Sequence, residues 1–403
     1  MARRRGGSAS PAPDPPARAV LAGVVLATLL LSAGAASAQS GTFRLSGYLE
    51  HQFSLAETPD GWTHTDYDRL RLDIEGRAGR GVSASAAVVW QIYRGRTRID
   101  LRDVVPAALR DQVPRGVTFT IDDRQFLNHA YVALYAGPFT VTAGKQYLAW
   151  GRGLVFNPTE LFRPKILFDP GYEREGVGAL SATVEAGTLS DVALVYVPEE
   201  AWRTSAKVAR ARSHLAGFDV SALVAETWDD DAVGELLGAP DPLRRRYTLG
   251  GDISGELPGV GIWAEGTWST RDDGDWVELI VGGNTTLPGN VLLNIEGYFD
   301  GRGEWAKRYP VEEWLAVAVG ERRTIGRGLL FGSLSRPTGD LLTLAVAGLG
   351  NLGDGSVALL PNARYSFAEN VDLFLQLVLA VGPDGSEFGT QGHGGFIRGR
   401  VYF

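Results

Sequence analysis

The stretch Phe43-Arg-Leu-Ser-Gly-Tyr-Leu-Glu-His-Gln-Phe53 alternates in polarity along its length. Its odd-numbered positions include Phe43, Leu45 and Leu49, and its even-numbered positions are Arg44, Ser46, Tyr48, Glu50 and Gln52. Successive side chains of a β-strand point to opposite faces, whereas a helix repeats about every 3.6 residues. The period of two therefore predicts a strand with one apolar face and one polar face.

The same alternation recurs through the rest of the chain. Leu70, Leu72 and Ile74 alternate with arginine and acidic residues, and similar patterns occupy 82–90, 130–135 and 371–377. The 403 residues include 52 glycines but one methionine, which suits strands and tight turns better than packed helices. Two longer segments, 101–113 and 311–323, have the apolar spacing of helices instead.

Short and long segments alternate between the predicted strands. The short ones include 79–81, 136–138, 256–259, 287–290 and 368–370, and the long ones are 94–126, 150–175, 229–243, 300–325 and 382–392. Transmembrane barrels have tight periplasmic turns, longer extracellular loops and strands of about 9–11 residues. We therefore predict an all-β fold, a transmembrane antiparallel β-barrel of about 18 strands (range about 16–18), with short periplasmic turns and long extracellular loops.

The tryptophans support a barrel in lipid. Amphipathic rings gather at membrane interfaces, whereas the tryptophans of a soluble core are found along strand centres. Only Trp263 falls clearly at a strand centre. The loop-facing ends of the predicted strands carry Trp90, Trp150, Trp202, Trp228, Trp268 and Trp276.

The first residues have the pattern of an export signal. Arg3, Arg4 and Arg5 precede an apolar run at 19–31 and the small residues Ala36-Ser37-Ala38. A spanning helix needs about 20 apolar residues, so a cleaved signal peptide explains the pattern better than an anchor. We predict a signal peptide at 1–38, a single barrel domain at 39–403, and export to the cell outer membrane.

The last residues, 395–403, resemble the terminal strand of bacterial outer-membrane proteins. Ile397, Val401 and Phe403 share one face, and Arg398 and Arg400 share the other. The resemblance implies that the barrel-assembly machinery recognises the strand ending in Phe403.

The stretch 144–164, GKQYLAWGRGLVFNPTELFRP, opens the most distinctive segment of the chain. Gly151 and Gly153 permit backbone conformations that other residues avoid. The segment beyond them holds too many apolar side chains for a loop in water, so we predict that 150–175 folds inward and narrows the pore. The alternative is a structural cap or assembly element. The charged residues predicted to line the constriction are Arg152, Glu160, Arg163, Lys165, Asp169 and Arg174.

This stretch also resembles a motif of substrate-specific Gram-negative porins, especially the 18-stranded alginate-export type. The motif has the form Gly-(Arg/Lys)-Gln, an aromatic, Trp-Gly-x-Gly and then Asn-Pro-Thr-(Asp/Glu)-Leu-Phe. Its matches here are Gly144, Lys145, Gln146, Trp150, Gly151, Gly153 and 157–162. The resemblance implies a substrate channel.

The polar strand faces carry charges of both signs. In a wide barrel such charges face water and set ion selectivity, or they pair across strands and hold the wall, as Arg71 and Glu50 are placed to do. The residues predicted to line the lumen are Arg69, Arg71, Asp73, Glu75, Arg398 and Arg400.

Several other functions are disfavoured. The chain has no cysteine, no G-x-S-x-G or H-E-x-x-H motif and no basic stripe, so we predict no enzyme, no cofactor, no metal site and no nucleic-acid partner. The expected partners are outer-membrane lipid, lipopolysaccharide and a small-molecule solute. We predict a porin-like channel for passive diffusion of a small hydrophilic or anionic solute. The alternatives are a structural or adhesive barrel with a blocked lumen, a barrel that passes an apolar ligand, and a barrel-embedded hydrolase.

Overall fold

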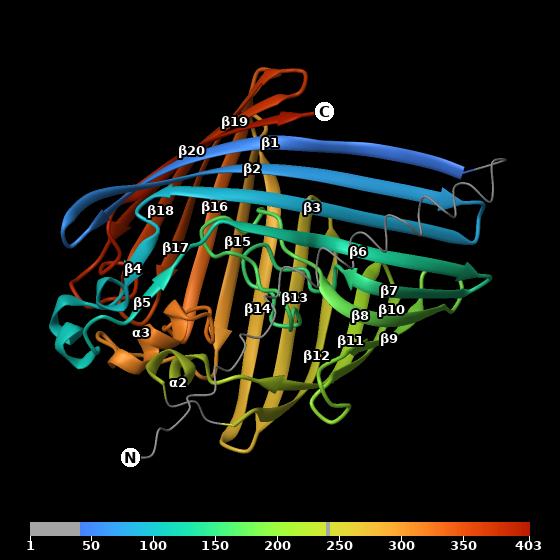
Figure 1. Ribbon diagram of the computed structural model, residues 1–403, viewed down its shortest axis with the longest axis horizontal. Helices are drawn as coiled ribbons and strands as arrows, with labels where there is room; N and C mark the ends of the chain where they lie inside the picture. The colour runs from blue at the N-terminus through green and yellow to red at the C-terminus, as the bar shows by residue number, and fades with distance from the viewer. Residues whose placement is uncertain (1–40, 239–241) are drawn as a thin grey trace, which may run out of the picture.

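The computed structural model describes residues 41–238 and 242–403, which form a closed barrel of 18 antiparallel strands (Figure 1). The strands are β1 (Gly41–Thr58), β2 (Gly61–Ala78), β3 (Val82–Gly95), β6 (Arg124–Ala136), β7 (Phe139–Gln146), β8 (Val177–Glu185), β9 (Asp191–Val197), β10 (Ala206–Leu215), β11 (Phe218–Asp229), β12 (Arg244–Leu257), β13 (Val260–Arg271), β14 (Gly274–Leu287), β15 (Val291–Asp300), β16 (Gly328–Thr338), β17 (Leu342–Asn351), β18 (Val357–Ala368), β19 (Val371–Val381) and β20 (Gly394–Tyr402). The predicted fold class and strand number are confirmed. The predicted signal peptide lies outside the described residues.

The last strand closes the ring on the first. β20 pairs with β1 from Tyr48↔Tyr402 to Ala56↔Gly394, and Phe403 continues the ladder through two main-chain hydrogen bonds with Gly47 (2.9 and 3.1 Å). A Cβ on Gly47 would lie 2.2 Å from the Arg71 carbonyl oxygen, so this crowded position requires glycine. The closed ring satisfies the backbone of every strand along the wall, as a barrel in lipid requires.

The connections differ between the two ends of the barrel. One end has short turns throughout, whereas the other has the long connections 96–123, 147–176, 230–243, 301–327 and 382–393. Two connections at that long-loop end, 59–60 and 272–273, are also tight turns, which the alternation of lengths did not predict. These two turns join the paired strands of the hairpins β1–β2 and β13–β14.

The long connections contain the few helices, which pack together at the left of Figure 1. The segment predicted as one helix at 101–113 forms two 3₁₀ turns, because Pro106 lacks the N–H that a continuous helix would use. The elements here are β4 (Arg98–Asp100), η1 (Leu101–Asp103), η2 (Ala107–Gln112), β5 (Thr118–Thr120), α2 (Ala232–Leu237) and α3 (Val311–Ala318). Leu101, Val105, Trp314, Leu315 and Ile325 form their common core. Within the described residues, no helix is long and apolar enough to cross a membrane.

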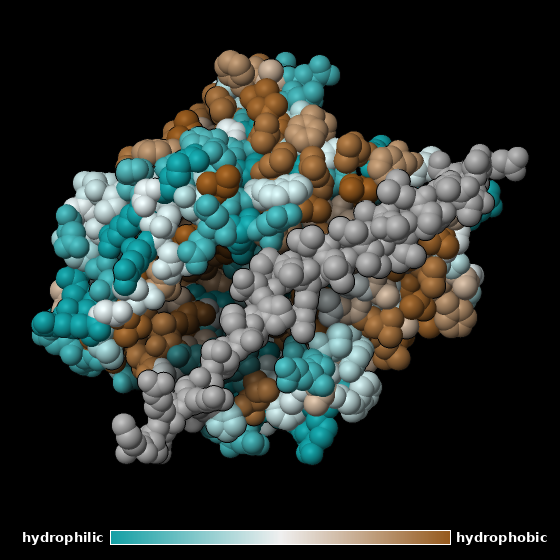
Figure 2. All heavy atoms as spheres, in the orientation of Figure 1, coloured by the Kyte–Doolittle hydropathy of each residue, from teal (hydrophilic) through white to brown (hydrophobic). Residues whose placement is uncertain are grey.

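The outer face of the wall is apolar. Phe43, Leu45 and Leu49 of β1 are 70%, 59% and 54% exposed, while Glu50 is buried on the opposite face. Figure 2 shows hydrophobic side chains over the flank of the barrel and hydrophilic ones gathered at the left, over the long connections. This arrangement matches the alternation that predicted the strands.

Two tryptophans differ from the prediction for the interface. Trp150 packs on Phe162 and on buried residues of β8–β11, inside the barrel. Trp276 also lies inside. It lies at the loop-facing end of β14 but points inward and is only 7% exposed. Its ring contacts the guanidinium groups of Arg271 and Arg302 (5.4 and 4.9 Å), and its Nε1 donates to Glu278 (3.4 Å). Cation–π attraction to these arginines explains the inward position. Trp202 and Trp268 are exposed as predicted.

Candidate functional site

The connection between β7 and β8, residues 147–176, lies inside the barrel and is called the inner loop here (Figure 1). Its main-chain amides contact β13 and β15, and its side chains contact β1, β2 and β20 at a different part of the ring. The inner loop therefore crosses the interior and contacts walls that lie far apart.

One carboxylate of β15 holds the first part of the inner loop. The fully buried Glu296 accepts hydrogen bonds from the amides of Leu154, Val155 and Phe156 (2.6, 3.0 and 3.0 Å) and from Trp263 Nε1 (2.8 Å). Hydrogen bonds to an ionised acceptor are roughly twice as strong as neutral ones. Glu296 thus anchors three consecutive loop amides to the wall.

A second carboxylate, Glu265 of β13, binds residues on both sides of those held by Glu296. It accepts hydrogen bonds from the amides of Arg152 (2.8 Å) and Thr159 (2.6 Å), and from the Thr159 hydroxyl (2.7 Å). Asn157 Nδ2 donates to the same carboxylate (3.3 Å). The alternating pattern puts both glutamates on polar strand faces but indicates no role for them, and each anchors the inner loop.

Two glycines make this approach possible. Gly151 has φ +88°, and a Cβ there would lie 2.4 Å from Glu265 Oε2. A Cβ on Gly153 would lie 1.8 Å from the Phe156 carbonyl oxygen. Gly151 therefore meets the predicted conformational requirement, whereas Gly153 is needed for space rather than for a positive φ.

Apolar packing fixes the inner loop on two sides of the lumen. The Phe156 ring stacks on Tyr298 of β15 (4.2 Å between centroids, 5° between planes). Phe156 belongs to a buried cluster with Val155, Trp263, Ile280, Tyr298, Leu329, Phe331, Leu349, Ala358 and Phe388. On the other side, Trp150, Leu161 and Phe162 pack against buried residues of β8–β11. Part of the inner wall is therefore as apolar as the outer wall.

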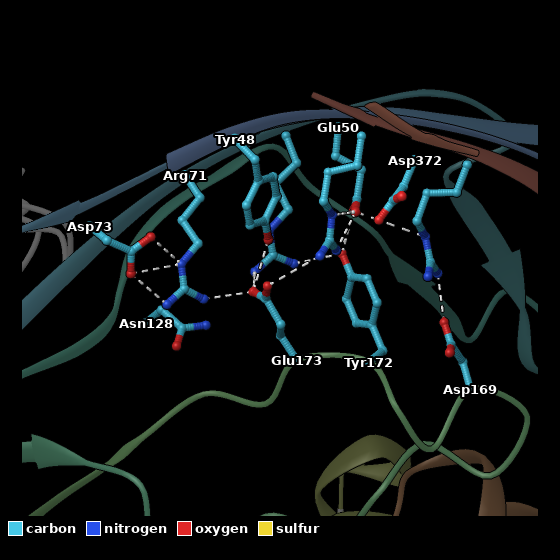
Figure 3. Close-up of polar contacts among 12 residues, drawn as sticks. Tyr48, Glu50, Arg71, Asp73, Asn128, Asp169, Tyr172, Glu173 and Asp372 are labelled. Carbon is cyan, nitrogen blue, oxygen red and sulfur yellow. Dashed lines mark hydrogen bonds and ion pairs between the residues drawn. The ribbon is translucent and has the colours of Figure 1, made fainter. Parts of the chain in front are cut away.

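A polar network joins the end of the inner loop to β1, β2 and β20 (Figure 3). Glu173 accepts from Arg71 Nη1 (2.6 Å) and from the Tyr48 hydroxyl (2.8 Å). Tyr172 donates to Glu50 (2.7 Å) and accepts from Arg69 Nη1 (2.8 Å). The network places loop carboxylates and a phenol against arginines of the wall.

The predicted lumen-lining residues gather mainly in this network. Arg69 and Arg71 contact Glu173, and Arg400 pairs with Glu50 (2.5 Å) and Glu173 (3.6 Å). Arg398 pairs with Asp169 (2.6 Å), and Asp73 pairs with Arg71 (2.7 Å). Glu75 is exposed near the 79–81 turn, outside the network. The suggested Arg71–Glu50 pair is wrong, because Arg71 pairs with Asp73 and Glu173 instead.

Most of the predicted constriction residues have partners. Arg152 contacts Asp252 and Asp219 of the wall (both 3.3 Å), Asp169 pairs with Arg398, and Glu160 pairs with Arg174. Lys165 Nζ donates to the carbonyls of Gly153 (2.5 Å) and Leu154 (3.1 Å). Only the Arg163 side chain is exposed. Burial raises the pKa of Glu160 and lowers that of Lys165, because it disfavours the charged form of each group.

A cavity of about 410 Å³ lies between the inner loop and the long connections. Pro158, Leu161 and Phe162 of the inner loop contribute to its lining. Its lining has one more arginine than carboxylates, namely Arg244, Arg246, Arg271, Arg302, Arg322 and Arg323 against Glu160, Asp229, Asp230, Glu278 and Glu321. Of these six arginines, only Arg246 stands on a polar strand face in the alternating pattern of the sequence. The others flank long connections or lie within them, where alternation gives no direction.

The arginines of this cavity differ in their partners. Arg271 pairs with Asp273 (2.6 Å) and Asp229 (3.3 Å), whereas the Arg323 guanidinium donates to the main-chain oxygen of Glu160 (3.2 Å). This carbonyl oxygen is uncharged, so it does not neutralise the guanidinium of Arg323. Arg323 therefore leaves positive charge directly beside the inner loop.

Glu387, in the connection 382–393, links the connections 301–327 and 352–356 beside this site. It accepts from the amides of Ile325 (2.8 Å) and Gly326 (3.1 Å) and from Asn351 Nδ2 (2.7 Å). Its own amide donates to Asp354 Oδ2 (2.8 Å). Burial raises the pKa of Glu387 from 4.5 to about 6.

This raised pKa predicts a pH-dependent stability. The folded barrel keeps the Glu387 proton to higher pH than the unfolded chain, so the free energy of unfolding should fall as pH rises from 4.5 to about 6. The expected loss is about 2 kcal/mol, since one pKa unit corresponds to about 1.4 kcal/mol. Urea unfolding followed by gel mobility at several pH values measures it. Glu387→Gln should remove this part of the slope, and an unchanged slope would contradict the assignment.

Comparisons with known proteins give a general likeness only. No protein-family model and no curated protein matches this chain. Among solved structures, it is similar to OmpT, an outer membrane protein of Vibrio cholerae in its trimer form (9% identity, TM-score 0.45, covering 91% of this chain and 100% of that one). It is also similar to a mutant of Rhodopseudomonas blastica porin (12% identity, TM-score 0.43, 90% and 100% covered). At such identities no function is transferred from these proteins.

Proposed function

We propose that this protein is an outer-membrane channel that passes a small hydrophilic or anionic solute by diffusion, with the inner loop as its filter. The observation that supports this most directly is the cavity of about 410 Å³ at the long-loop end. Its lining includes six arginines and residues of the inner loop. Charges lining a pore raise the local concentration of oppositely charged solutes and set selectivity. The excess positive charge at Arg323 favours anions.

The outer surface supports the membrane location. A closed antiparallel wall with an apolar exterior is one of two structures that span lipid with every backbone group paired. The long connections then face outside and the short turns face the periplasm. Recognition of the Phe403 strand by the barrel-assembly machinery, and the absence of catalysis, belong to the same proposal.

One alternative has its own support. The two apolar clusters around Phe156 and Phe162 fill part of the lumen, as expected of a barrel that is structural and closed. Conductance distinguishes the two proposals. The refolded protein in a planar bilayer should give stable current steps if it is a channel, and a folded barrel without current would favour the blocked lumen.

Ion selectivity tests the role of Arg323. Arg323→Glu changes the local charge by two, and each charge acts on a monovalent ion at about 8 Å with about 0.5 kcal/mol in water. The anion permeability should therefore fall and the cation permeability rise, each by about fivefold, so their ratio should fall by about thirtyfold, measured from the reversal potential in a salt gradient. Arg336→Glu is the matched control, because Arg336 is exposed near the 339–341 turn at the opposite end. Equal ratios for both variants would contradict anion selection at Arg323.

A further inference from the structure

The outer wall of β10–β12 carries charged and aromatic side chains at its long-loop end. Lys207 lies directly opposite Glu226, which in turn lies opposite Tyr247. Directly paired residues share a sheet face. Tyr247 is 48% exposed, and Lys207 also lies opposite Tyr196, whose other cross-strand partner is the exposed Leu180. These side chains therefore face outward, where a barrel in the outer membrane meets the outer leaflet.

Two cations share one carboxylate in this group. Lys207 Nζ lies 3.0 Å from Glu226 Oε2, and Arg245 Nε lies 3.3 Å from Glu226 Oε1. The trio has an excess of one positive charge. The exposed Glu199, Glu200 and Arg203 of the neighbouring connection 198–205 add a net charge of −1, but the ion pairs of Lys207 and Arg245 are with Glu226. A cation facing lipid is unfavourable away from the interface, so its presence here favours an anionic partner.

Aromatic rings support both cations. Lys207 Nζ lies 5.1 Å from the centre of the Trp202 ring, and the Arg245 guanidinium lies 4.9 Å from that of Trp228. Trp202 also stacks on Tyr196 (4.8 Å). Such rings hold the cationic groups at the headgroup level of a bilayer.

An apolar groove runs from this group along the wall. It has a volume of about 550 Å³ and is lined by Leu180, Leu194, Val224 and Lys207, among others. Leu194 and Val224 are more than half exposed. A groove with an apolar body and a cationic end complements an amphiphile that has an acyl chain and an anionic headgroup.

We propose that Lys207, Arg245, Trp202 and Trp228 bind a phosphorylated glycolipid of the outer leaflet, with phosphate oxygens on the two cations and an acyl chain in the groove. Lysine and arginine form charge-assisted hydrogen bonds with phosphate. This assignment rests on the outer-membrane location in the proposed function. It does not require that the barrel conduct.

Binding of bisphosphorylated lipid A to the refolded barrel in detergent tests the proposal. Lys207→Gln/Arg245→Gln should weaken binding by about thirtyfold, because each of the two cations contributes about 1 kcal/mol near an anionic surface. Dephosphorylated lipid A should bind the wild type about as weakly as bisphosphorylated lipid A binds the variant. Quenching of tryptophan fluorescence gives the affinities, and native mass spectrometry gives the number of lipids bound.

Three controls complete the test. Arg336→Gln removes an exposed arginine at the opposite end and should bind lipid A as the wild type does. Lys207→Arg/Arg245→Lys keeps both charges and should also bind normally, which guards against a folding defect in the glutamine variant. Equal affinity of the glutamine variant and the wild type, or no effect of removing the phosphates, would overturn the proposal. Current steps recorded from the same preparations test the channel separately.

Discussion

Deleting residues 154–170 should raise the single-channel conductance several-fold. Barrels of 16–18 strands are wide enough to leave an aqueous channel when nothing fills them. The deletion removes the Phe156 ring that stacks on Tyr298, the Asp169 carboxylate that pairs with Arg398, and the Phe168 carbonyl that accepts from Gln376. Thirteen residues, 147–153 and 171–176, remain to join Gln146 and Val177, which already pair across β7 and β8. The shortened connection therefore closes without distorting the wall.

The barrel should survive this deletion. Glu296 loses its three loop amides, and Glu265 loses Asn157 and Thr159 but keeps the Arg152 amide. Both carboxylates would then face water, which hydrates them. Two measurements check the fold: the difference in gel mobility between heated and unheated samples, and the β-sheet signal in circular dichroism. Deletion of 232–237, the short helix α2 of another long connection, is the control and should change the conductance little. If the 154–170 deletion conducts like the wild type, the inner loop does not limit the current.

The barrel could be predicted from the sequence because lipid and water impose opposite demands on alternate residues. Leu45 and Leu49 face outward while Glu50 is buried inside, as the period of two requires. The alternation of short and long connections also indicated that the long ones gather at one end. Even the inward position of the inner loop was foreseen, because a loop with Phe156, Leu161 and Phe162 has to bury them.

The partners of the inner loop could not be predicted in the same way. Where the inner loop packs, the inner wall is apolar too, so Trp263, Ile280 and Tyr298 interrupt the alternation that marks a water-filled lumen. Pairing between loop and wall also depends on contacts between residues more than a hundred positions apart, as for Phe156 and Glu296. One signal was present: Glu296 is a lone acid in an otherwise apolar or uncharged stretch, 291–299. Such an acid requires donors nearby.

Glu296→Ala should release the inner loop from β15. The substitution leaves the amides of Leu154, Val155 and Phe156 without their acceptor, as well as Trp263 Nε1. A buried group without a partner costs about 1–3 kcal/mol, so four of them cost about 4 kcal/mol or more. The ratio of released to anchored loop should then rise by about a thousandfold, at about 1.4 kcal/mol for each factor of ten.

Trypsin measures this release directly. In the anchored loop the Lys165 amine donates to the carbonyls of Gly153 and Leu154, and Glu296 binds the Leu154 amide. Cleavage after Lys165 should therefore be slow. Cleavage at that bond should be much faster in Glu296→Ala, as followed by mass spectrometry. Asn294→Ala is the control, because Asn294 lies two residues away on the same face of β15 but donates to Ser333 (3.0 Å). Equal cleavage rates in the wild type and Glu296→Ala would contradict the anchoring role.

The conductance of Glu296→Ala separates the two proposals for the lumen. If the inner loop is the filter of a channel, its release should increase the current or its fluctuations together with trypsin cleavage. If cleavage increases while the bilayer stays silent, the apolar side chains of the wall and of the 382–393 connection, Phe388 among them, still close the lumen. The blocked barrel then becomes the better proposal, because the buried carboxylate would serve to hold a plug in place rather than to position a filter.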